Sequence, residues 1–428
     1  MIRCVFVFVF SLLLFSAARA GADTYNQAEF DIRENVEIRE LHADILSAPT
    51  NEVINLTRKV FTQRGQDNRV CVQVRKTQEA FYILFLNEED GRFPVFSRGS
   101  WIIKRDLATG DFVQVKIFFH SDPGSFVRIF PDKGGAVRGK SLMDLYLFNR
   151  RIQHDVPLGG SFVSLLTLPF AAIIETSRGT VNWRGLIPPV DASAYRNILT
   201  MTKTLRARLG RFANVDDGAM DSDGRMVFIA TLEPQDAGKP AGFNCSGFVK
   251  WIADGLYAPL TGKLLDIKEL KTKHPEARGS FISRRYEDRR DPFFGLDWSR
   301  NIALAFARLS PGGQTAGIES SDVRGLPYWK YMEDIGYAAK DIPAILHYLA
   351  LTEPGSIYIA SVNREFGSDP VLRQHTHVAV LLPVIDAAGK FSCAVMDTTV
   401  ESSLQRLTGR GDFIHLVRIK ARAEFSPP

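Results

Sequence analysis

Apolar and polar side chains alternate along much of the first half of the chain. Between about residues 68 and 182 the period is two, most clearly where Val113, Val115 and Ile117 alternate with Gln114 and Lys116. This period predicts strands with one buried face. Similar runs occur at 69–75, 80–87, 99–104, 126–130 and 142–148, with turn-forming residues between them. We therefore predict an antiparallel β domain over residues 68–190.

One further stretch precedes this domain and another lies within it. Residues 21–67 show a mixed pattern and are predicted to be partly helical. The apolar run from Phe162 to Ile174 contains Pro169 and is too short for a membrane span, so we predict a buried pair of strands there. Pro188 and Pro189 end the pattern, and we expect a domain boundary near residue 190.

Beyond residue 190 the apolar residues recur at helical spacing. They predict a helix over about 195–209, a helix capped by Asp297, and a helix from Asp341 with Pro343 in its first turn. Strands are predicted at 356–362, 375–382, 392–397 and 413–420. Helices followed by strands are typical of an α+β domain.

The composition is that of a globular protein. The chain has 428 residues, of which 45% are hydrophobic and 24% are charged, and this length favours two domains. A net charge of +5 is mild and does not indicate a nucleic-acid partner.

The first 20 residues have the pattern of a secretory signal peptide. Arg3 precedes an apolar run that ends at Ala18-Arg19-Ala20, a small-x-small cleavage pattern. We expect export to the periplasm or the medium, at the cell envelope, with no integral membrane segment after cleavage. Three cysteines would then be left, Cys71, Cys245 and Cys393, and we expect all three to be free thiols, with a Cys71–Cys393 disulfide as the alternative.

Cys245 lies where a helix is predicted to begin. Asn244 can cap the first helical turn, Gly247 permits close approach of another backbone segment, and an apolar run opens with Phe248. The first turn of a helix has unpaired N–H groups and a partial positive charge, so it stabilises a thiolate. Cys245 is therefore a candidate nucleophile.

The segment Asn244-Cys245-Ser246-Gly247-Phe248 resembles the signature of NlpC-type cell-wall peptidases, which are papain-like cysteine enzymes. Asn244 stands where that family usually has Asp, which keeps the cap. The resemblance covers about residues 195–400 and implies a papain-like α+β domain over 191–428. It also implies an exported hydrolase that cleaves an amide of peptidoglycan stem peptides, typically the γ-D-glutamyl to diamino acid bond.

A cysteine nucleophile needs an imidazole to exchange its proton and a third polar group to orient that imidazole. By the resemblance His377, which opens an apolar strand, is the base. Asp397 ends the following strand, where the family places its third polar residue. His375 should point to the same face as His377, either as a substitute base or as a residue that supports it.

The resemblance also implies an oxyanion site at the helix start, from the N–H of Cys245 with Ser246 beside it. The family's usual Tyr before the nucleophile is absent from 209–214. A separation of 132 positions between Cys245 and His377 implies a long insertion at about 258–355. Its arginines at 284, 285, 289 and 290 could line a lid that recognises an acidic stem peptide, or could form a solvated surface, which we favour.

Several alternatives stay open. A transglutaminase-like acyl transferase also uses Cys, His and Asp in this order. An envelope-binding protein on a decayed peptidase scaffold is the non-enzymatic alternative. His375 and His377 could be half of a zinc site, but no upstream pair of ligands supports it. We expect neither a metal nor an organic cofactor, and we expect the β domain to bind the wall or an envelope partner.

Overall fold

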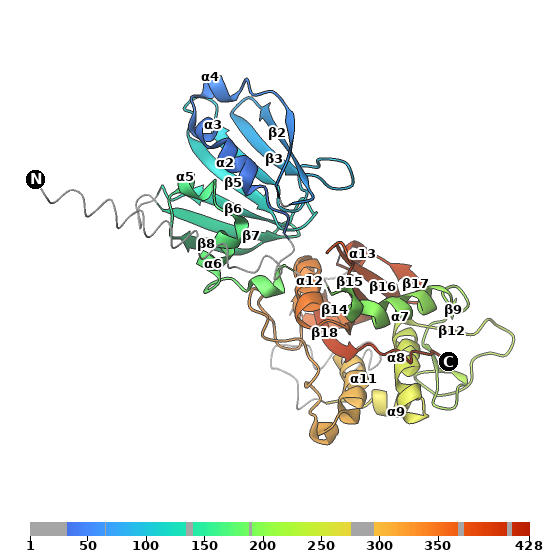
Figure 1. The fold of residues 1–428 in the computed structure, drawn as a ribbon. Helices are drawn as coiled ribbons and strands as arrows, with labels where there is room; N and C mark the ends of the chain where they lie inside the picture. Colours follow the sequence, from blue (N-terminus) through green and yellow to red (C-terminus); the bar gives the residue numbers. More distant parts are fainter. Residues whose placement is uncertain are drawn as a thin grey trace, which may run out of the picture. The chain divides into compact units, whose positions relative to one another are not determined.

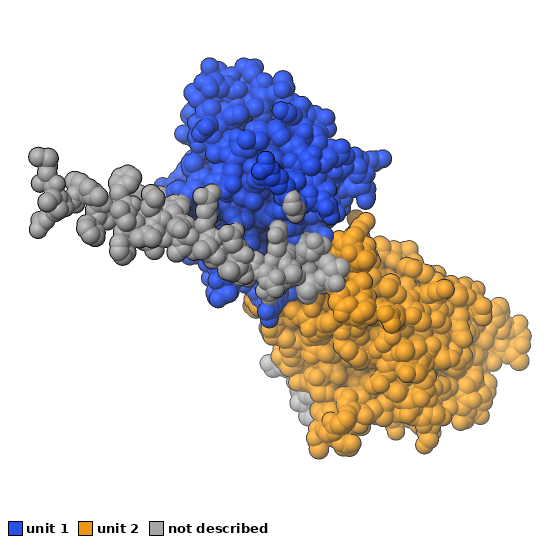
Figure 2. Space-filling view, viewed as in Figure 1, with its two compact units in different colours: residues 1–190 blue, residues 191–428 orange. Residues whose placement is uncertain are grey.

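The computed structural model describes residues 32–64, 66–133, 140–187, 191–274, 295–366, 372–408 and 413–428. The chain divides into two compact units, Met1–Val190 and Asp191–Pro428, which are coloured separately in Figure 2. The sequence analysis places a boundary near the same position.

Unit 1 is built on one antiparallel sheet in which neighbouring strands follow each other in the chain, from β1 to β8 (Figure 1). The strands are β1 (Lys59–Thr62), β2 (Arg69–Lys76), β3 (Ala80–Asn87), β4 (Trp101–Asp106), β5 (Phe112–Phe118), β6 (Phe126–Pro131), β7 (Ser141–Leu147) and β8 (Arg150–Leu158). The large antiparallel sheet predicted from the alternating pattern is therefore present, with β1 and β8 as strands that the pattern did not predict.

Helices cover one face of this sheet. They are α2 (Val36–Leu41), α3 (Ala43–Ser47), α4 (Thr50–Val53), α5 (Phe162–Leu165) and α6 (Phe170–Ser177). The guanidinium of Arg39 in α2 lies 3.6 Å from the centre of the Trp101 ring, and Arg105 donates to the carbonyls of Leu46 and Ala48 at the end of α3. The covered face is thus the one that carries Trp101 and Arg105.

The apolar run from Phe162 to Ile174 is helical, so the predicted strand pair is wrong. Ser161 caps α5, since its side chain accepts a hydrogen bond from the N–H of Ser164. Pro169 is the residue before α6, where its missing N–H costs nothing. A short apolar run has no periodicity long enough to separate the two states.

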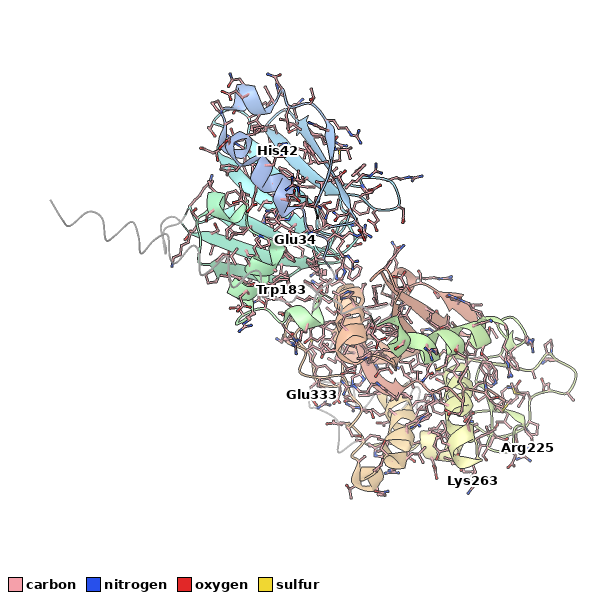
Figure 3. All side chains as sticks on the ribbon, viewed as in Figure 1. Glu34, His42, Trp183, Arg225, Lys263 and Glu333 are labelled. Carbon is pink, nitrogen blue, oxygen red and sulfur yellow. The ribbon has the colours of Figure 1, made fainter. Side chains whose placement is uncertain are left out.

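Buried polar groups join the helices to the sheet of unit 1. Glu34, labelled in Figure 3, accepts from Arg39 and from the N–H of Phe170. Burial raises the pKa of Glu34, although Arg39 opposes this effect. Trp183, also labelled, packs edge-on against Phe170. These contacts fix the segment before α2 and the segment after α6 on the same side of the sheet.

Unit 2 contains helices and an antiparallel sheet. Its principal helices are α7 (Arg196–Arg206), α8 (Cys245–Thr261), α9 (Ile267–Leu270), α11 (Leu296–Leu309), α12 (Ile342–Thr352) and α13 (Leu404–Thr408). The six-stranded sheet has the order β13-β18-β14-β15-β16-β17, from β13 (Tyr337–Ala338), β14 (Ser356–Phe366), β15 (Leu372–Ile385), β16 (Phe391–Asp397), β17 (Val400–Ser402) and β18 (Phe413–Lys420). Short pairs form from β9 (Ala213–Asn214) with β12 (Gly242–Phe243), and from β10 (Gly218–Met220) with β11 (Met226–Phe228).

The sheet of unit 2 is buried on both faces. Val378, Val380 and Leu382 of β15 belong to the core that includes α7, α8 and α11. Ala379 and Leu381, which alternate with them, belong to the core that includes α12. Apolarity on both faces explains why β15 reads as a continuous apolar run.

The predicted helices and strands of unit 2 are confirmed with one correction. Asp297 does not cap α11, because the residue before the helix is Gly295. The carboxylate of Asp297 instead accepts from the backbone N–H of His274. The chain is a mixed α+β protein, and none of the helices in its described part is both long and apolar enough to cross a membrane.

Candidate active site

Cys245 is the first residue of α8, a helix of 17 residues. Oδ1 of Asn244 accepts a hydrogen bond from the N–H of Gly247 at 2.8 Å, so the predicted cap is present. Gly262 ends the helix with φ of 70°, a left-handed conformation that suits glycine. The thiol of Cys245 thus lies at the end of a long helix where the backbone N–H groups point out of the helix.

Tight packing holds the start of α8. The N–H of Asn244 donates to the carbonyl of Gly218 in β10 at 3.0 Å. The indole N–H of Trp298 in α11 donates to the carbonyl of Ser246 at 3.2 Å. Cys245 is buried, with 6% of its surface exposed, in the core that also contains Phe248 and Ile252. The position of the sulfur is therefore set by contacts from two other elements.

His377 lies in β15 and has partners on both sides. Its Nε2 lies 2.7 Å from Oδ1 of Asp397. The thiol of Cys245 also interacts with the imidazole and contributes to the raised pKa of His377. Because Asp397 engages Nε2, Nδ1 is the ring nitrogen that we assign to the thiol. The structure brings together the three residues, Cys245, His377 and Asp397, that the sequence analysis selects for a triad.

The electrostatics of His377 favour its protonated form. Burial acts to lower the pKa of the imidazole, but the interactions with Asp397 and Cys245 outweigh burial and raise the pKa to about 9. At neutral pH the ring therefore carries a proton on both nitrogens. A protonated imidazole is the form that can pair with a thiolate and can later give a proton to a leaving group.

Asp397 is held by the hairpin that joins β16 to β17. It pairs with Val400 across a two-residue turn in which Thr398 and Thr399 both have positive φ, of 42° and 66°. The hydroxyl of Thr398 donates to the Asp397 carboxylate at 3.3 Å. The carboxylate of Asp397 therefore both supports this turn and pairs with His377, and the side chain is 97% buried.

His375 does not share the surroundings of His377. Val362 in β14 pairs with His377 but the next residue, Asn363, pairs with His375, so Thr376 is an extra residue in β15. Such a bulge interrupts the alternation of side chains, and the prediction that both histidines point to one face is wrong. Nε2 of His375 donates to the carbonyl of Asp334, and its ring lies 6.4 Å from that of His415.

His375 contacts a buried polar network that the sequence analysis did not predict. Arg300 in α11 donates to Asp322 and Asp334, each at 2.7 Å, and His415 in β18 lies 3.3 Å from Asp322. Burial acts to raise the pKa of Asp322, but the close approach of His415 and the hydrogen bonds from Arg300 dominate and lower it. These residues are far apart in the sequence and lie in no motif, so no local signal joins them.

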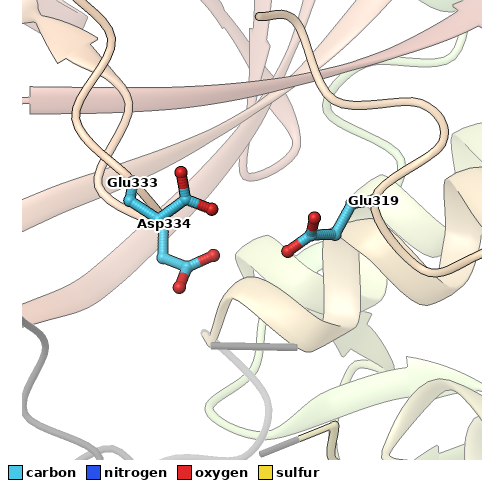
Figure 4. A group of neighbouring side chains, drawn as sticks. All are labelled: Glu319, Glu333 and Asp334. Atoms are coloured by element: carbon cyan, nitrogen blue, oxygen red, sulfur yellow. The ribbon is translucent and has the colours of Figure 1, made fainter. Parts of the chain in front are cut away.

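Three carboxylates of this region lie close enough to hold a metal ion. Glu319, Glu333 and Asp334 each offer an oxygen within 4.8 Å of the others, and Figure 4 shows them facing a common space. Arg300 pairs with Asp334, and Arg324 pairs with Glu319 and Glu333 at 3.2 Å each. Because Arg300 and Arg324 bridge these carboxylates, ion pairing accounts for their proximity.

The other two thiols differ from Cys245. Cys71 and Cys393 are free, as is Cys245, so the alternative disulfide does not form. Cys71 lies in the core of unit 1. Burial raises the pKa of the Cys393 thiol far above its usual range, and this disfavours a thiolate there.

Two expectations concern residues outside the described part of the chain. They are the signal peptide over residues 1–20 and the lid or solvated surface with arginines at 284, 285, 289 and 290.

Comparison with known proteins gives one match. Residues 28–185 match the model of a family described as a domain of unknown function, DUF8515. The matched segment lies within unit 1 and does not include Cys245, His377 or Asp397. No curated protein and no solved structure matches the chain.

Proposed function

We propose that unit 2 is a papain-like cysteine hydrolase with Cys245 as nucleophile, His377 as general acid and base, and Asp397 as the residue that orients His377. The observation that carries this proposal is that the imidazole of His377 lies 2.7 Å from the Asp397 carboxylate and also interacts with the Cys245 thiol. A thiol at a helix start, an imidazole and a buried carboxylate in this order form a nucleophile, base and orienting group.

The reaction follows from these positions. The thiolate of Cys245 attacks the carbonyl carbon of an amide, and the oxyanion forms near the first N–H groups of α8. His377 gives its proton to the leaving amine as the C–N bond breaks, which leaves a thioester on Cys245. Neutral His377 then takes a proton from water, the hydroxide displaces the sulfur, and the acid product leaves. Asp397 keeps Nδ1 directed at the sulfur throughout.

We propose an amide of peptidoglycan stem peptides as the substrate, with the γ-D-glutamyl to diamino acid bond as the first candidate. This part rests on the resemblance of residues 244–248 and of the His377 strand to NlpC-type cell-wall peptidases. Export to the cell envelope, by the signal pattern of residues 1–20, would bring the enzyme to this polymer. The first proposal concerns the chemistry of the site and does not depend on this substrate.

The test is incubation of the full chain with purified peptidoglycan, followed by mass spectrometry of the released peptides. We expect new amino termini on the diamino acid. Cys245→Ala and iodoacetamide should abolish this product, by about 10³-fold or more for the variant, whereas Cys393→Ala and EDTA should leave it unchanged. Equal activity of Cys245→Ala, or loss of activity with EDTA alone, would reject the thiol mechanism.

A transglutaminase-like acyl transferase is the second candidate, favoured by Asp as the third residue of the triad. The same thioester would be intercepted by an amine in place of water. Adding a fluorescent primary amine to the assay distinguishes the two: incorporation of label that exceeds hydrolysis supports transfer. If neither hydrolysis nor transfer occurs on peptidoglycan or on glutamine-containing peptides, a binding role on a decayed scaffold is favoured.

A further inference from the structure

Unit 1 has a second sheet face, opposite the one covered by its helices, and it carries cations and aromatic rings. We define the open face as the side of β4–β8 that presents Lys104, Lys116, Arg128, Phe130, Tyr146 and Arg151. Cross-strand pairs place these residues together: Lys116 pairs with Arg128, and Tyr146 pairs with Arg151. Arg151 is exposed and the other five are half-buried.

The cations of the open face are not balanced by the carboxylates around them. Asp144 is buried and is already engaged by Arg128, by Arg151 and by the backbone N–H of Asp155. Asp106, at the end of β4, accepts two backbone N–H groups of the following turn. Neither Lys104 nor Lys116 forms an ion pair with a described carboxylate, and Nε of Arg128 is buried without a partner among the described residues.

Lys116 and Arg128 are like charges directly opposite each other on neighbouring strands, which is an unfavourable arrangement. Burial lowers the pKa of Lys116, and Arg128 lowers it further. Aromatic rings offset part of this cost, since Nζ of Lys116 lies 3.9 Å from the ring centre of Phe126. An anion placed between Lys116 and Arg128 would remove the repulsion.

Aromatic rings lie beside the cations of this face. The guanidinium of Arg128 lies 5.0 Å from the ring centre of Phe130 and 5.8 Å from that of Tyr146. Half-exposed aromatic rings present flat apolar surface on which the C–H face of a sugar can pack. Cations beside such rings can pair with carboxylates on the same polymer.

We propose that the open face binds an acidic polysaccharide, with sugar rings against Phe130 and Tyr146 and carboxylates against Lys104, Lys116 and Arg128. Neighbouring strands are about 4.8 Å apart, so these cations are spaced by about 5–10 Å. Duplex DNA presents one charge per about 1.7 Å, which is denser than this face. A polymer with one carboxylate on each sugar or disaccharide fits the spacing better.

The test measures binding of the full chain to polygalacturonate, a polymer of carboxylated sugars, and to its methyl ester, which lacks the charge. The variant Lys104→Gln/Lys116→Gln should bind polygalacturonate about three- to tenfold more weakly, as expected for the loss of two charge contacts from half-buried side chains. The matched control is Lys59→Gln/Lys76→Gln, because these lysines pair with Val72 and Phe81 on the helix-covered side of the sheet. The control should bind as the unmodified chain does.

Three outcomes would overturn the proposal: equal binding of the esterified polymer, equal weakening by the control pair, or tighter binding of poly(dT) or poly-L-glutamate than of polygalacturonate. Equal binding of the ester would show that charge plays no role. Equal weakening by the control pair would show that the open face is not the binding surface, and tighter binding of poly(dT) or poly-L-glutamate would show that the face does not select a sugar polymer. If the lysine variant does not fold, Arg151→Gln is the second variant, since Arg151 is exposed. Binding is measured without hydrolysis, so its failure is separate from failure of the proposed function.

Discussion

The carbonyl oxygen of Gly218 lies 2.0 Å from the position that a Cβ on Gly247 would take. This close approach joins β10 to the first turn of α8, and it explains why glycine follows Ser246. A larger residue at 247 has to displace either the strand or the helix start that holds the thiol.

We predict that Gly247→Ala lowers stability by about 1–3 kcal/mol, the usual cost of overpacking, and that it slows amide hydrolysis more than this loss explains. The measurements are urea unfolding and kcat/KM. The control is Gly238→Ala, where a Cβ meets no atom within 4 Å. An unchanged kcat/KM in Gly247→Ala would contradict the prediction, because it would show that hydrolysis does not depend on the exact position of the Cys245 sulfur.

Alkylation should distinguish the three cysteines. We predict that iodoacetamide modifies Cys245 first, because its thiol lies at a helix start beside the imidazole of His377, whereas Cys393 reacts more slowly, because burial raises the pKa of its thiol. Peptide mass spectrometry after brief labelling checks the order. In His377→Gln the labelling of Cys245 should slow by at least about tenfold. Preferential labelling of Cys393 in the unmodified chain would contradict the prediction.

The pH profile should report His377. Its imidazolium must protonate the leaving amine, so kcat/KM should fall as the pH rises through about 9, the pKa of His377. Asp397→Asn removes interactions that raise this pKa, so the fall should begin at lower pH. Glu401→Gln is the control, because Glu401 pairs with Arg206 and not with the imidazole. An unchanged profile in Asp397→Asn would exclude the orienting role.

The same shift predicts a dependence of stability on pH. The pKa of His377 is higher in the folded chain than its ordinary value of 6.5. Protonation therefore stabilises the folded state fully below pH 6.5, and this contribution is lost as the pH rises to about 9. We expect Tm to fall over that range by more in the unmodified chain than in His377→Gln, as measured by thermal unfolding.

The two histidines of β15 offer a matched comparison. His375→Gln keeps a donor for the carbonyl of Asp334, so we predict a change in kcat/KM of less than about tenfold, with some loss of Tm from the buried network. His377→Gln should lower kcat/KM by about 10³-fold with less effect on Tm. If His375→Gln lowered kcat/KM more than His377→Gln does, His375 and not His377 would be the base.

Much of the fold follows from local patterns. The strand β15 can be predicted because the residues on both of its faces are apolar, and the hairpin that brings Asp397 back toward His377 can be predicted from the turn at 387–390. The bulge at Thr376 cannot be predicted from the sequence, since one extra residue leaves the apolar pattern of β15 unchanged. Likewise, no local pattern indicates that Asp297 accepts from the backbone N–H of His274 and does not cap α11.

The candidate site divides in the same way. Asn244, Cys245 and Gly247 act within one helical turn, so their roles can be inferred from neighbours in the sequence. The network of Arg300, Asp322, Asp334 and His415 depends on the packing of α11 against β18, and charged residues in the sequence are usually exposed. Only the fold shows that these charges are buried together.

A buried ion pair in α8 gives the last prediction. Lys250 and Asp254 are one turn apart, 2.6 Å from each other and fully buried, and Asp254 also accepts the N–H of Leu265. Removing one member leaves a buried charge unpaired, so Asp254→Ala should cost about 3–5 kcal/mol. The double variant Lys250→Met/Asp254→Asn removes both charges and keeps an acceptor for Leu265, so it should recover most of that loss. Urea unfolding checks both values, and Asp236→Ala, which breaks the exposed Lys239–Asp236 pair, should change stability little. If the double variant is as unstable as Asp254→Ala, the cost of the single variant comes from lost packing of α8 and not from the unpaired lysine.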